Sequence, residues 1–263
     1  MFKSRRNFFI FGIMGFMCQF NGAQEAMALE FKISPFALYE QGQENIYIDG
    51  VRTKYGLGVL GVAGETMLGS DFSVRGRLGY GYHPKARVSL SVDSTEVAVT
   101  GPVEGLYLEA AVDYLVLSRP MYSLTSELMF ISRNIDASDL TGFAGSRAIT
   151  GTAVNDFDTL DLTLEAKFVM GKKAFLNISG GLSQWHLKTT AVAHSATGGS
   201  GPILCPCSYT KKIDTTSVDP VMGISIISNN PLHNVGLEFY NRSLESKAGT
   251  QIFGIELEYM FQF

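Results

Sequence analysis

The sequence predicts an all-β protein, an antiparallel up-and-down β-barrel that spans a membrane, on three observations. First, the six apolar side chains at odd positions from Phe253 to Phe263 share one face of a strand, with Glu256 and Glu258 on the other. Successive strand side chains point to opposite faces, so this ribbon has one apolar side and one polar side. Second, the chain begins like an exported protein. Third, beyond that beginning no run of about 20 apolar residues could cross a bilayer as a helix.

The amino-terminal segment has the order of a secretory signal peptide. Lys3, Arg5 and Arg6 precede an uncharged run from Phe8 to Phe20, and Ala26-Met27-Ala28 is a small-x-small cleavage site. The alternative is an uncleaved amino-terminal anchor. We expect cleavage after residue 28, which leaves residues 29–263 as a single barrel domain. The removed segment is basic, so the mature chain is mildly acidic and has no general electrostatic attraction to nucleic acid.

Working back from Phe263, the alternating segments predict about ten strands, with eight and twelve as alternatives. The expected strands are residues 29–41, 52–64, 71–92, 104–117, 122–134, 158–170, 174–188, 217–228, 232–243 and 250–263. Pro84 cannot donate a ladder hydrogen bond, and His83-Pro84-Lys85-Ala86 resembles a turn. We interpret residues 71–92 as one long strand with a bulge at Pro84, because a turn there would give an odd number of strands.

The connections between these strands differ in length. Residues 118–121, 171–173 and 228–231 are short, whereas residues 134–157 and 189–217 are long. Membrane barrels have short turns on the periplasmic side and longer loops outside, and this assignment alternates correctly along the chain. A soluble β-sandwich shows the same period of two and is the alternative fold. The mean hydropathy of +0.12 fits strands that hide half of their residues from lipid.

An outward apolar face places many charged side chains in the lumen. The candidate lumen-lining or ligand residues are Arg75, Arg77, Glu109, Asp113, Glu165, Lys167, Glu238, Arg242, Glu256 and Glu258. Charges in a narrow barrel must be paired or hydrated. They predict a lumen closed by ion pairs, and the alternative is a narrow polar pore or an internal ligand site. Both alternatives need the same mixture of charges.

The carboxy-terminal half resembles the small outer-membrane barrels of the OmpA/OmpX type. Gly-rich alternating strands such as Asn177-Ile-Ser-Gly-Gly-Leu182 precede a long connection, and an aromatic strand ends the chain at Phe263. The resemblance covers architecture, through generic motifs. It implies the bacterial outer membrane, contact with lipid and lipopolysaccharide, assembly through the strand that ends in Phe263, and a monomer. It implies structural or surface-interaction roles rather than enzyme activity, with a narrow porin-like channel or small-ligand transporter as the alternative.

An outer-membrane hydrolase is the second alternative, and the sequence gives it little support. His186 and His194 are expected in or near the second long loop, with acidic residues on the first, but without the Asp-x-Asp and Asp-x-His spacing of omptin proteases. No histidine is expected on a lipid-facing position, where a lipid A deacylase would need one. We therefore predict no catalytic residue.

Cys205-Pro206-Cys207 is the one unusual short motif and lies in the second long loop. The expectation is a local disulfide, although one intervening residue strains such a bond. Free thiols or an intermolecular bridge are the alternatives. Two thiolates fall short of a four-ligand metal set, so we expect no metal and no cofactor.

Overall fold

A computed structural model describes residues 31–42, 46–48, 51–54, 56–92, 95–144, 147–171, 174–195, 208–228, 233–248 and 251–262. Nearly all of them are β-strand. The strands are β1 (Phe31–Gly42), β2 (Ile46–Ile48), β3 (Val51–Lys54), β4 (Gly56–Leu68), β5 (Phe72–Val92), β6 (Thr95–Ser118), β7 (Tyr122–Ala144), β8 (Arg147–Met170), β9 (Ala174–Ser195), β10 (Ser208–Ser228), β11 (His233–Ser243) and β12 (Gln251–Gln262), with one helical turn, α2 (Glu245–Ala248). The predicted signal peptide, Cys205, Cys207 and Phe263 lie outside the described residues.

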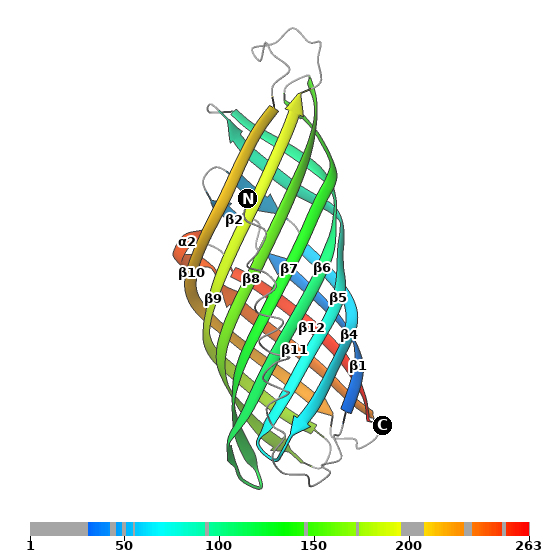
Figure 1. Ribbon diagram of the computed structural model, residues 1–263, viewed down its shortest axis with the longest axis vertical. Coiled ribbons are helices and arrows are strands. Elements are labelled where there is room, and N and C mark those ends of the chain that lie inside the picture. Colours follow the sequence, from blue (N-terminus) through cyan, green and yellow to red (C-terminus); the bar gives the residue numbers. More distant parts are fainter. Residues whose placement is uncertain are drawn as a thin grey trace, which may run out of the picture.

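Ten of these strands close into an antiparallel barrel, as the sequence predicted (Figure 1). Neighbouring strands pair in chain order from β4 to β12, and β1 joins β4 to β12 to complete the ring. The predicted alternatives of eight and twelve barrel strands are therefore wrong. The two remaining strands, β2 and β3, form a short hairpin. It pairs with the part of β5 that extends past the first residue of β4.

The strands run much farther than predicted at one end of the barrel. Residues 135–144 extend β7 and residues 147–157 begin β8, although both segments were expected in a loop. Likewise, β9 continues to Ser195 and β10 starts at Ser208, within the second expected loop. The cause is that the inward faces of these extensions carry buried apolar side chains such as Ile149 and Ile213. The extensions are therefore paired and packed rather than loose.

The interpretation of Pro84 is confirmed. Strand β5 is continuous from Phe72 to Val92, and its register with β6 shifts between His83 and Ala86. The bulge places the proline where no ladder hydrogen bond is required of it. It also changes the inward positions from odd numbers, such as Arg77, to even numbers, such as Ala86 and Val88, both of which are buried.

Short turns connect the strands at the opposite end, which we call the short-turn end and which also holds the start of β1 and the end of β12 (Figure 1). Gly69 and Gly171 have φ angles of 86° and 63° in two of these turns. Glycine is favoured there because other residues rarely adopt the left-handed region. The part of the barrel nearest this end is called the lower half below, and the extended part the upper half.

The outer wall of the lower half is a continuous apolar surface. Exposed side chains on it include Leu60, Val62, Leu78, Leu108, Val112, Leu128, Leu162, Leu164, Ile178, Leu182, Met222, Ile224, Ile226, Leu237, Ile255 and Leu257. Tyr39, Tyr80, Tyr82 and Tyr114 are also exposed, as expected of residues that anchor a barrel at the edge of a membrane. Within the described ranges, no helix is long and apolar enough to cross a membrane.

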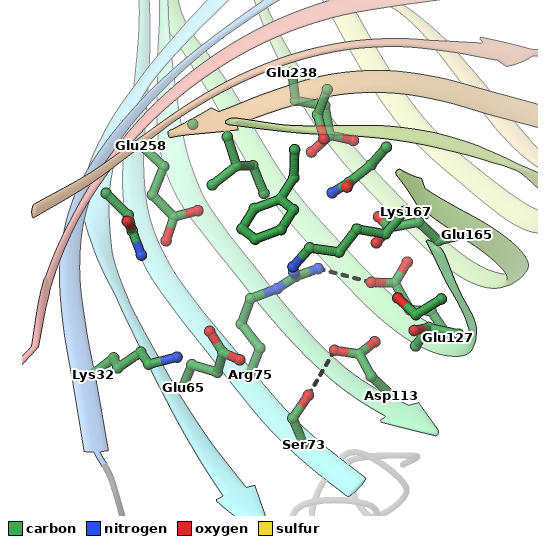
Figure 2. Close-up of a pocket in the computed structure, with 18 of the residues that line it drawn as sticks. Lys32, Glu65, Ser73, Arg75, Asp113, Glu127, Glu165, Lys167, Glu238 and Glu258 are labelled. Atoms are coloured by element: carbon green, nitrogen blue, oxygen red, sulfur yellow. Dashed lines mark hydrogen bonds and ion pairs between the residues drawn. The ribbon is translucent and has the colours of Figure 1, made fainter. Parts of the chain in front are cut away.

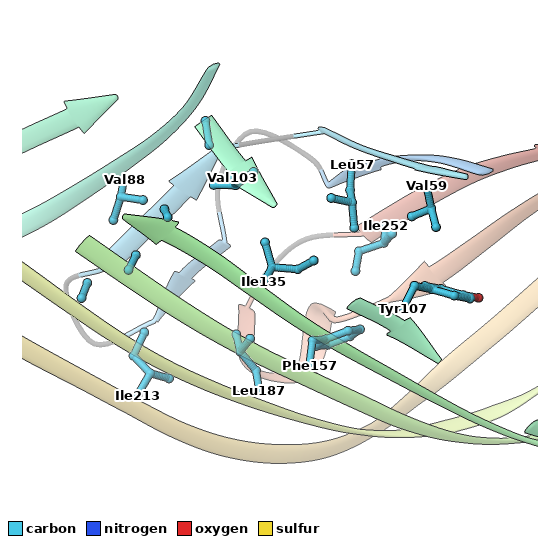
Figure 3. Packing of buried hydrophobic residues seen from close by; sticks show 14 of the residues in the cluster. Leu57, Val59, Val88, Val103, Tyr107, Ile135, Phe157, Leu187, Ile213 and Ile252 are labelled. Atoms are coloured by element: carbon cyan, nitrogen blue, oxygen red, sulfur yellow. The ribbon is translucent and has the colours of Figure 1, made fainter. Parts of the chain in front are cut away.

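The upper half has the reverse arrangement, with an apolar core inside the barrel (Figure 3). Val88, Val103 and Ile135 face Leu187 and Ile213 across the interior, each of them almost completely buried. Burial of such side chains contributes roughly 1.5–3 kcal/mol each. The upper half is thus held together from within, as in a soluble β-protein.

Two glycines make room for Phe36, a buried aromatic residue of this core. A Cβ atom at Gly61 would lie 2.6 Å from a ring carbon of Phe36, and one at Gly79 would lie 3.2 Å from another. Gly61 is paired with both Phe36 and Gly79 across the sheet. The glycines are required here because the ring lies directly against their backbone.

The turn α2 is fastened to the edge of β10 by a polar cluster around the buried Asp219. Asp219 accepts hydrogen bonds from the indole of Trp185 at 2.7 Å and from the hydroxyl of Ser246 at 2.6 Å. The Ser246 backbone N–H also donates to Asp219, at 3.3 Å. Ser217 and Ser246 share a further hydrogen bond of 2.6 Å. Above Val221, no other described strand pairs with this edge of β10, so α2 covers its base (Figure 1).

Candidate functional site in the barrel interior

The lower half encloses a polar cavity of about 370 Å³ (Figure 2). It reaches the short-turn end, where the turn residues Ser70 and Asp71 line it, and it extends inward to Arg77 and Glu256. The strand period of two builds it, because inward positions on all ten barrel strands carry mainly polar or charged side chains at this level. The volume lies within the range of small-ligand sites.

Arg75 projects into the cavity and is held by two carboxylates. Its Nε lies 3.2 Å from Glu109 and its Nη2 lies 2.9 Å from Glu127. The Arg75 side chain keeps 25% of its accessible surface, so water in the cavity can screen these pairs. Nearby, Asp113 accepts a hydrogen bond of 2.9 Å from Ser73. Figure 2 shows the Arg75 and Asp113 side chains directed toward the cavity.

Arg77 closes the inner end of the cavity as the centre of a buried ion-pair cluster. Its guanidinium lies 3.3 Å from Glu109, 2.5 Å from Glu256 and 2.6 Å from Glu258. Tyr107 donates a hydrogen bond of 2.7 Å to Glu109 from above. Three carboxylates share one nearly inaccessible guanidinium, so charge-assisted contacts hold Arg77 in place while the cluster keeps an excess of negative charge.

Two further arginines form drier pairs. Arg133 bonds to Glu40, which also accepts from Tyr240, and its guanidinium lies 5.6 Å from the ring centroid of Tyr107 and 5.2 Å from that of Phe157. Cation–π contacts of this kind strengthen when they are shielded from water.

Arg242 pairs with Asp161 and donates a hydrogen bond of 3.2 Å to Ser183. Arg242 and Asp161 are 1% and 0% exposed, so neither has access to water. The charged layer formed by Arg77, Arg133 and Arg242 therefore lies between the wet cavity and the apolar core.

The structure brings all ten candidate lumen residues into the interior. Arg75, Arg77, Asp113, Glu165, Lys167, Glu238, Glu256 and Glu258 line the cavity. Glu109 is buried between Arg75 and Arg77, and Arg242 is buried beside Asp161. Whether any of them binds a ligand stays a prediction. The proposed disulfide of Cys205 and Cys207 lies outside the described residues.

Sequence reasoning missed the interior role of Trp185. Aromatic residues near a barrel rim usually face the membrane edge, but Trp185 is 0% exposed and bonds to Asp219. Its two neighbours at the same parity, Ser183 and Leu187, are also buried. A search for alternation with the apolar side inward would have found it.

The histidines do not lie in loops. His186 and His194 are both on β9, at the parity that faces outward. His186 lies on the outer wall, four residues after the exposed Leu182 and on the same face of β9. Its Nε2 is 2.8 Å from Asp214. His186 thus faces outward above the apolar belt, and the expectation that no histidine occupies a lipid-facing position stays a prediction. Both partners of this pair are exposed.

The acidic residues considered with them, Asp136, Asp139, Asp156 and Asp158, also lie on strands, with Asp158 directly opposite His186. Ser132 donates a hydrogen bond of 2.6 Å to Asp158. These groups lie on the outside of the wall, so they do not converge on an enclosed space. In the part of the chain that the structure describes, no three His, Cys, Asp or Glu side chains are grouped so as to hold a metal ion.

The chain matches no protein-family model and no curated protein sequence. It is similar in structure to the outer-membrane protease OmpT of Escherichia coli, with a TM-score of 0.52, 10% identity, and coverage of 92% of this chain and 100% of that one. The outer-membrane protein OprG of Pseudomonas aeruginosa gives 0.42 and 13% identity, covering 89% and 97%. Ail, the attachment invasion locus protein of Yersinia pestis, gives 0.36 and 12%, covering 90% and 100%. The fold is that of an outer-membrane β-barrel.

Proposed function

We propose that the protein is a non-enzymatic barrel of the bacterial outer membrane whose interior is closed to solutes. In this proposal it acts through its structure and through the long upper hairpins, which extend outside the cell. Lipid and lipopolysaccharide surround the apolar belt, the terminal strand ending in Phe263 directs assembly, and the barrel is a monomer. The apolar belt on the lower half supports the membrane location, since such a surface is a liability in water.

One observation carries the closed interior: above the charged layer, the bore is filled by apolar side chains. Val99, Ile135 and Leu140 are each at most 2% exposed, and Phe157 and Trp185 pack at a centroid distance of 6.4 Å. A conducting pore needs a continuous polar or hydrated path, which this packing interrupts. The polar cavity of the lower half favours the alternative, a narrow channel, only as far as Arg77.

Planar-bilayer recording of the purified full-length protein tests this proposal. We expect no steady conductance, together with a heat-dependent change of mobility on semi-native gels that reports a folded barrel. An Arg75→Ser/Arg77→Ser double variant provides the comparison. In an open channel, loss of these two cations changes ion selectivity. Reproducible openings of the wild-type protein, with a selectivity that changes in the double variant, would therefore overturn the closed interior.

The absence of enzyme activity is proposed from the position of the histidines. His186 and Asp214 are exposed on the outer wall, so water reaches both side chains and nothing in their exposure favours an oriented substrate. Hydrolysis of peptide or lipid substrates by the reconstituted protein is expected to remain at background. Activity that disappears in His186→Ala or His194→Ala, with the barrel still folded, would contradict this part of the proposal.

A further inference from the structure

One rung of inward side chains crosses five consecutive strands on one wall of the cavity. Register pairing places Lys167 opposite Asn177, Asn177 opposite Ser225, and Ser225 opposite Glu238. Glu238 lies opposite Glu256 in turn. All five side chains line the cavity. Neighbouring inward positions on paired strands are about 5 Å apart, so these groups form a continuous polar strip.

Among the described residues, three members of this strip have no hydrogen-bond or ion-pair partner. Asn177 and Ser225 are 5% and 8% exposed; the Asn177 Oδ1 atom is buried without a hydrogen bond, and the Ser225 hydroxyl makes none to another described residue. Glu238 forms no ion pair with any residue in the described ranges, although it lies directly opposite a second carboxylate. Buried polar groups such as Asn177 and Ser225 are nearly always hydrogen-bonded, so this amide and hydroxyl, with the half-buried Glu238 carboxylate beside them, are open to a partner from outside the chain.

The charge of the cavity indicates the sign of that partner. Four basic side chains line it, namely Lys32, Arg75, Arg77 and Lys167, against eight acidic ones. Both arginines are already held by carboxylates, and Lys167 lies over the ring of Phe175, with its Nζ 4.3 Å from the centroid. The unpaired charge is therefore mainly negative, which attracts cations and disfavours phosphate or carboxylate ligands.

We propose that this strip binds a small organic cation through a primary ammonium group. An ammonium has three donors and no acceptor, and the strip offers it the Glu238 carboxylate, the Ser225 hydroxyl and the Asn177 carbonyl. Rotation of the Asn177 amide about its last torsion turns its oxygen toward the cavity. A charge-assisted hydrogen bond to Glu238 supplies most of the affinity, and the two neutral groups fix the orientation.

The opposite side of the cavity suits a second ammonium group, so the ligand class is a linear diamine. Figure 2 shows Asp113 on the far side of the cavity from Glu238, with Glu165 between them along the wall. Asp113 accepts only from Ser73 among the described residues, and Glu165 has no ion-pair partner there. Because the inner end of the cavity is closed at Arg77, the ligand enters and leaves from the short-turn end.

Isothermal titration of 1,4-diaminobutane into the folded full-length barrel in detergent tests the proposal. The wild-type protein is expected to bind it saturably, and Glu238→Gln to bind at least about tenfold more weakly, as the loss of one charge-assisted hydrogen bond requires. Glu65→Gln is the matched control, because it removes the same charge from the cavity on another strand. It is expected to change the affinity less than about threefold.

Ser225→Ala keeps the proposal falsifiable if Glu238→Gln does not fold, and it is expected to weaken binding by about threefold to tenfold. Absence of saturable binding to the wild-type protein would overturn the site. Equal weakening by Glu238→Gln and Glu65→Gln would also overturn it, because it would show diffuse attraction only. Saturable binding of inorganic phosphate in place of the diamine would reverse the inferred charge. These outcomes are independent of conductance, so this site and the closed interior fail separately.

Discussion

The two halves of the barrel interior are lined by side chains of opposite polarity. In the lower half, charged side chains surround a cavity of about 370 Å³, and Arg75 keeps a quarter of its side-chain surface. In the upper half, Val99, Ile135 and Leu140 fill the bore almost without exposed surface. The outer wall is inverted in the same way, with exposed leucines and isoleucines below and the exposed His186–Asp214 pair above.

This difference indicates that the medium outside the wall determines whether polar or apolar side chains fill the interior. Where lipid covers the outer face, apolar side chains are used there, and polar groups are left to the lumen. Where water covers the outer face, stability has to come from an apolar core, as in a soluble sandwich. The charged layer around Arg77, Arg133 and Arg242 marks the boundary between the two regimes.

The largest expected effect separates dry from wet ion pairs. Arg242→Ala is expected to lower the free energy of unfolding by about 3–5 kcal/mol, because it leaves Asp161 buried without its partner. Arg75→Ala is the matched control and should cost only about 1 kcal/mol, since the cavity hydrates the carboxylates it leaves behind. Urea unfolding in lipid vesicles, followed by the fluorescence of the single tryptophan, Trp185, measures both. Equal costs would erase the distinction between the halves.

A truncation of the same residue type in each half sharpens the comparison of packing. Leu140→Ala, in the upper core, is expected to cost about 2–5 kcal/mol, because a cavity remains in a close-packed region. Leu115→Ala, on the wall of the lower cavity, should cost about 1 kcal/mol, since that side chain already borders open space. The same urea titrations apply. A larger loss at Leu115 would show that the lower cavity is packed rather than open.

The smallest expected effect concerns the outer wall of the upper half. Asp214→Asn removes the carboxylate 2.8 Å from His186, but both partners are exposed, so the unfolding free energy should fall by about 0–1 kcal/mol. The residual effect should disappear in about 1 M salt, where such charges are screened. A loss above about 2 kcal/mol would mean that this pair supports the upper sheet in the way that Arg242 supports the interior.

The sequence was sufficient for the closed ring of ten strands, the bulge at Pro84 and the inward position of the candidate lumen residues, because the lower half follows one simple pattern. On β8, for instance, Leu160, Leu162 and Leu164 face outward, and Asp161 and Glu165 face inward. A period of two with a long apolar face is strong enough to fix parity without any knowledge of neighbours.

The upper half could not be predicted because the polarity of its two strand faces is reversed, with apolar side chains inside and polar side chains outside. Further up β8, Ile149, Ala153 and Phe157 are buried inside, while Thr152 and Thr150 face outward. Small and polar residues dominate these segments, and without lipid outside they resemble loops. The inward position of Trp185 was missed for the same reason. Glu238 was expected in the lumen, but Asn177 and Ser225 beside it escaped prediction, because their alignment with Glu238 depends on register across three strands.

The length of the upper hairpins has a consequence for biogenesis. Roughly 9–11 residues of a strand suffice to cross a membrane, whereas β7 and β8 contain 23 and 24 residues. In a membrane-inserted barrel, the tip of this hairpin must be translocated across the bilayer before Ile149 and Leu140 can meet their packing partners. The outward-facing polar side chains of Asn134 and Asp156 must cross the bilayer together with this hairpin. With the upper hairpins outside the cell, as proposed, folding of the distal core would be the last step of assembly and would be completed on the far side of the membrane.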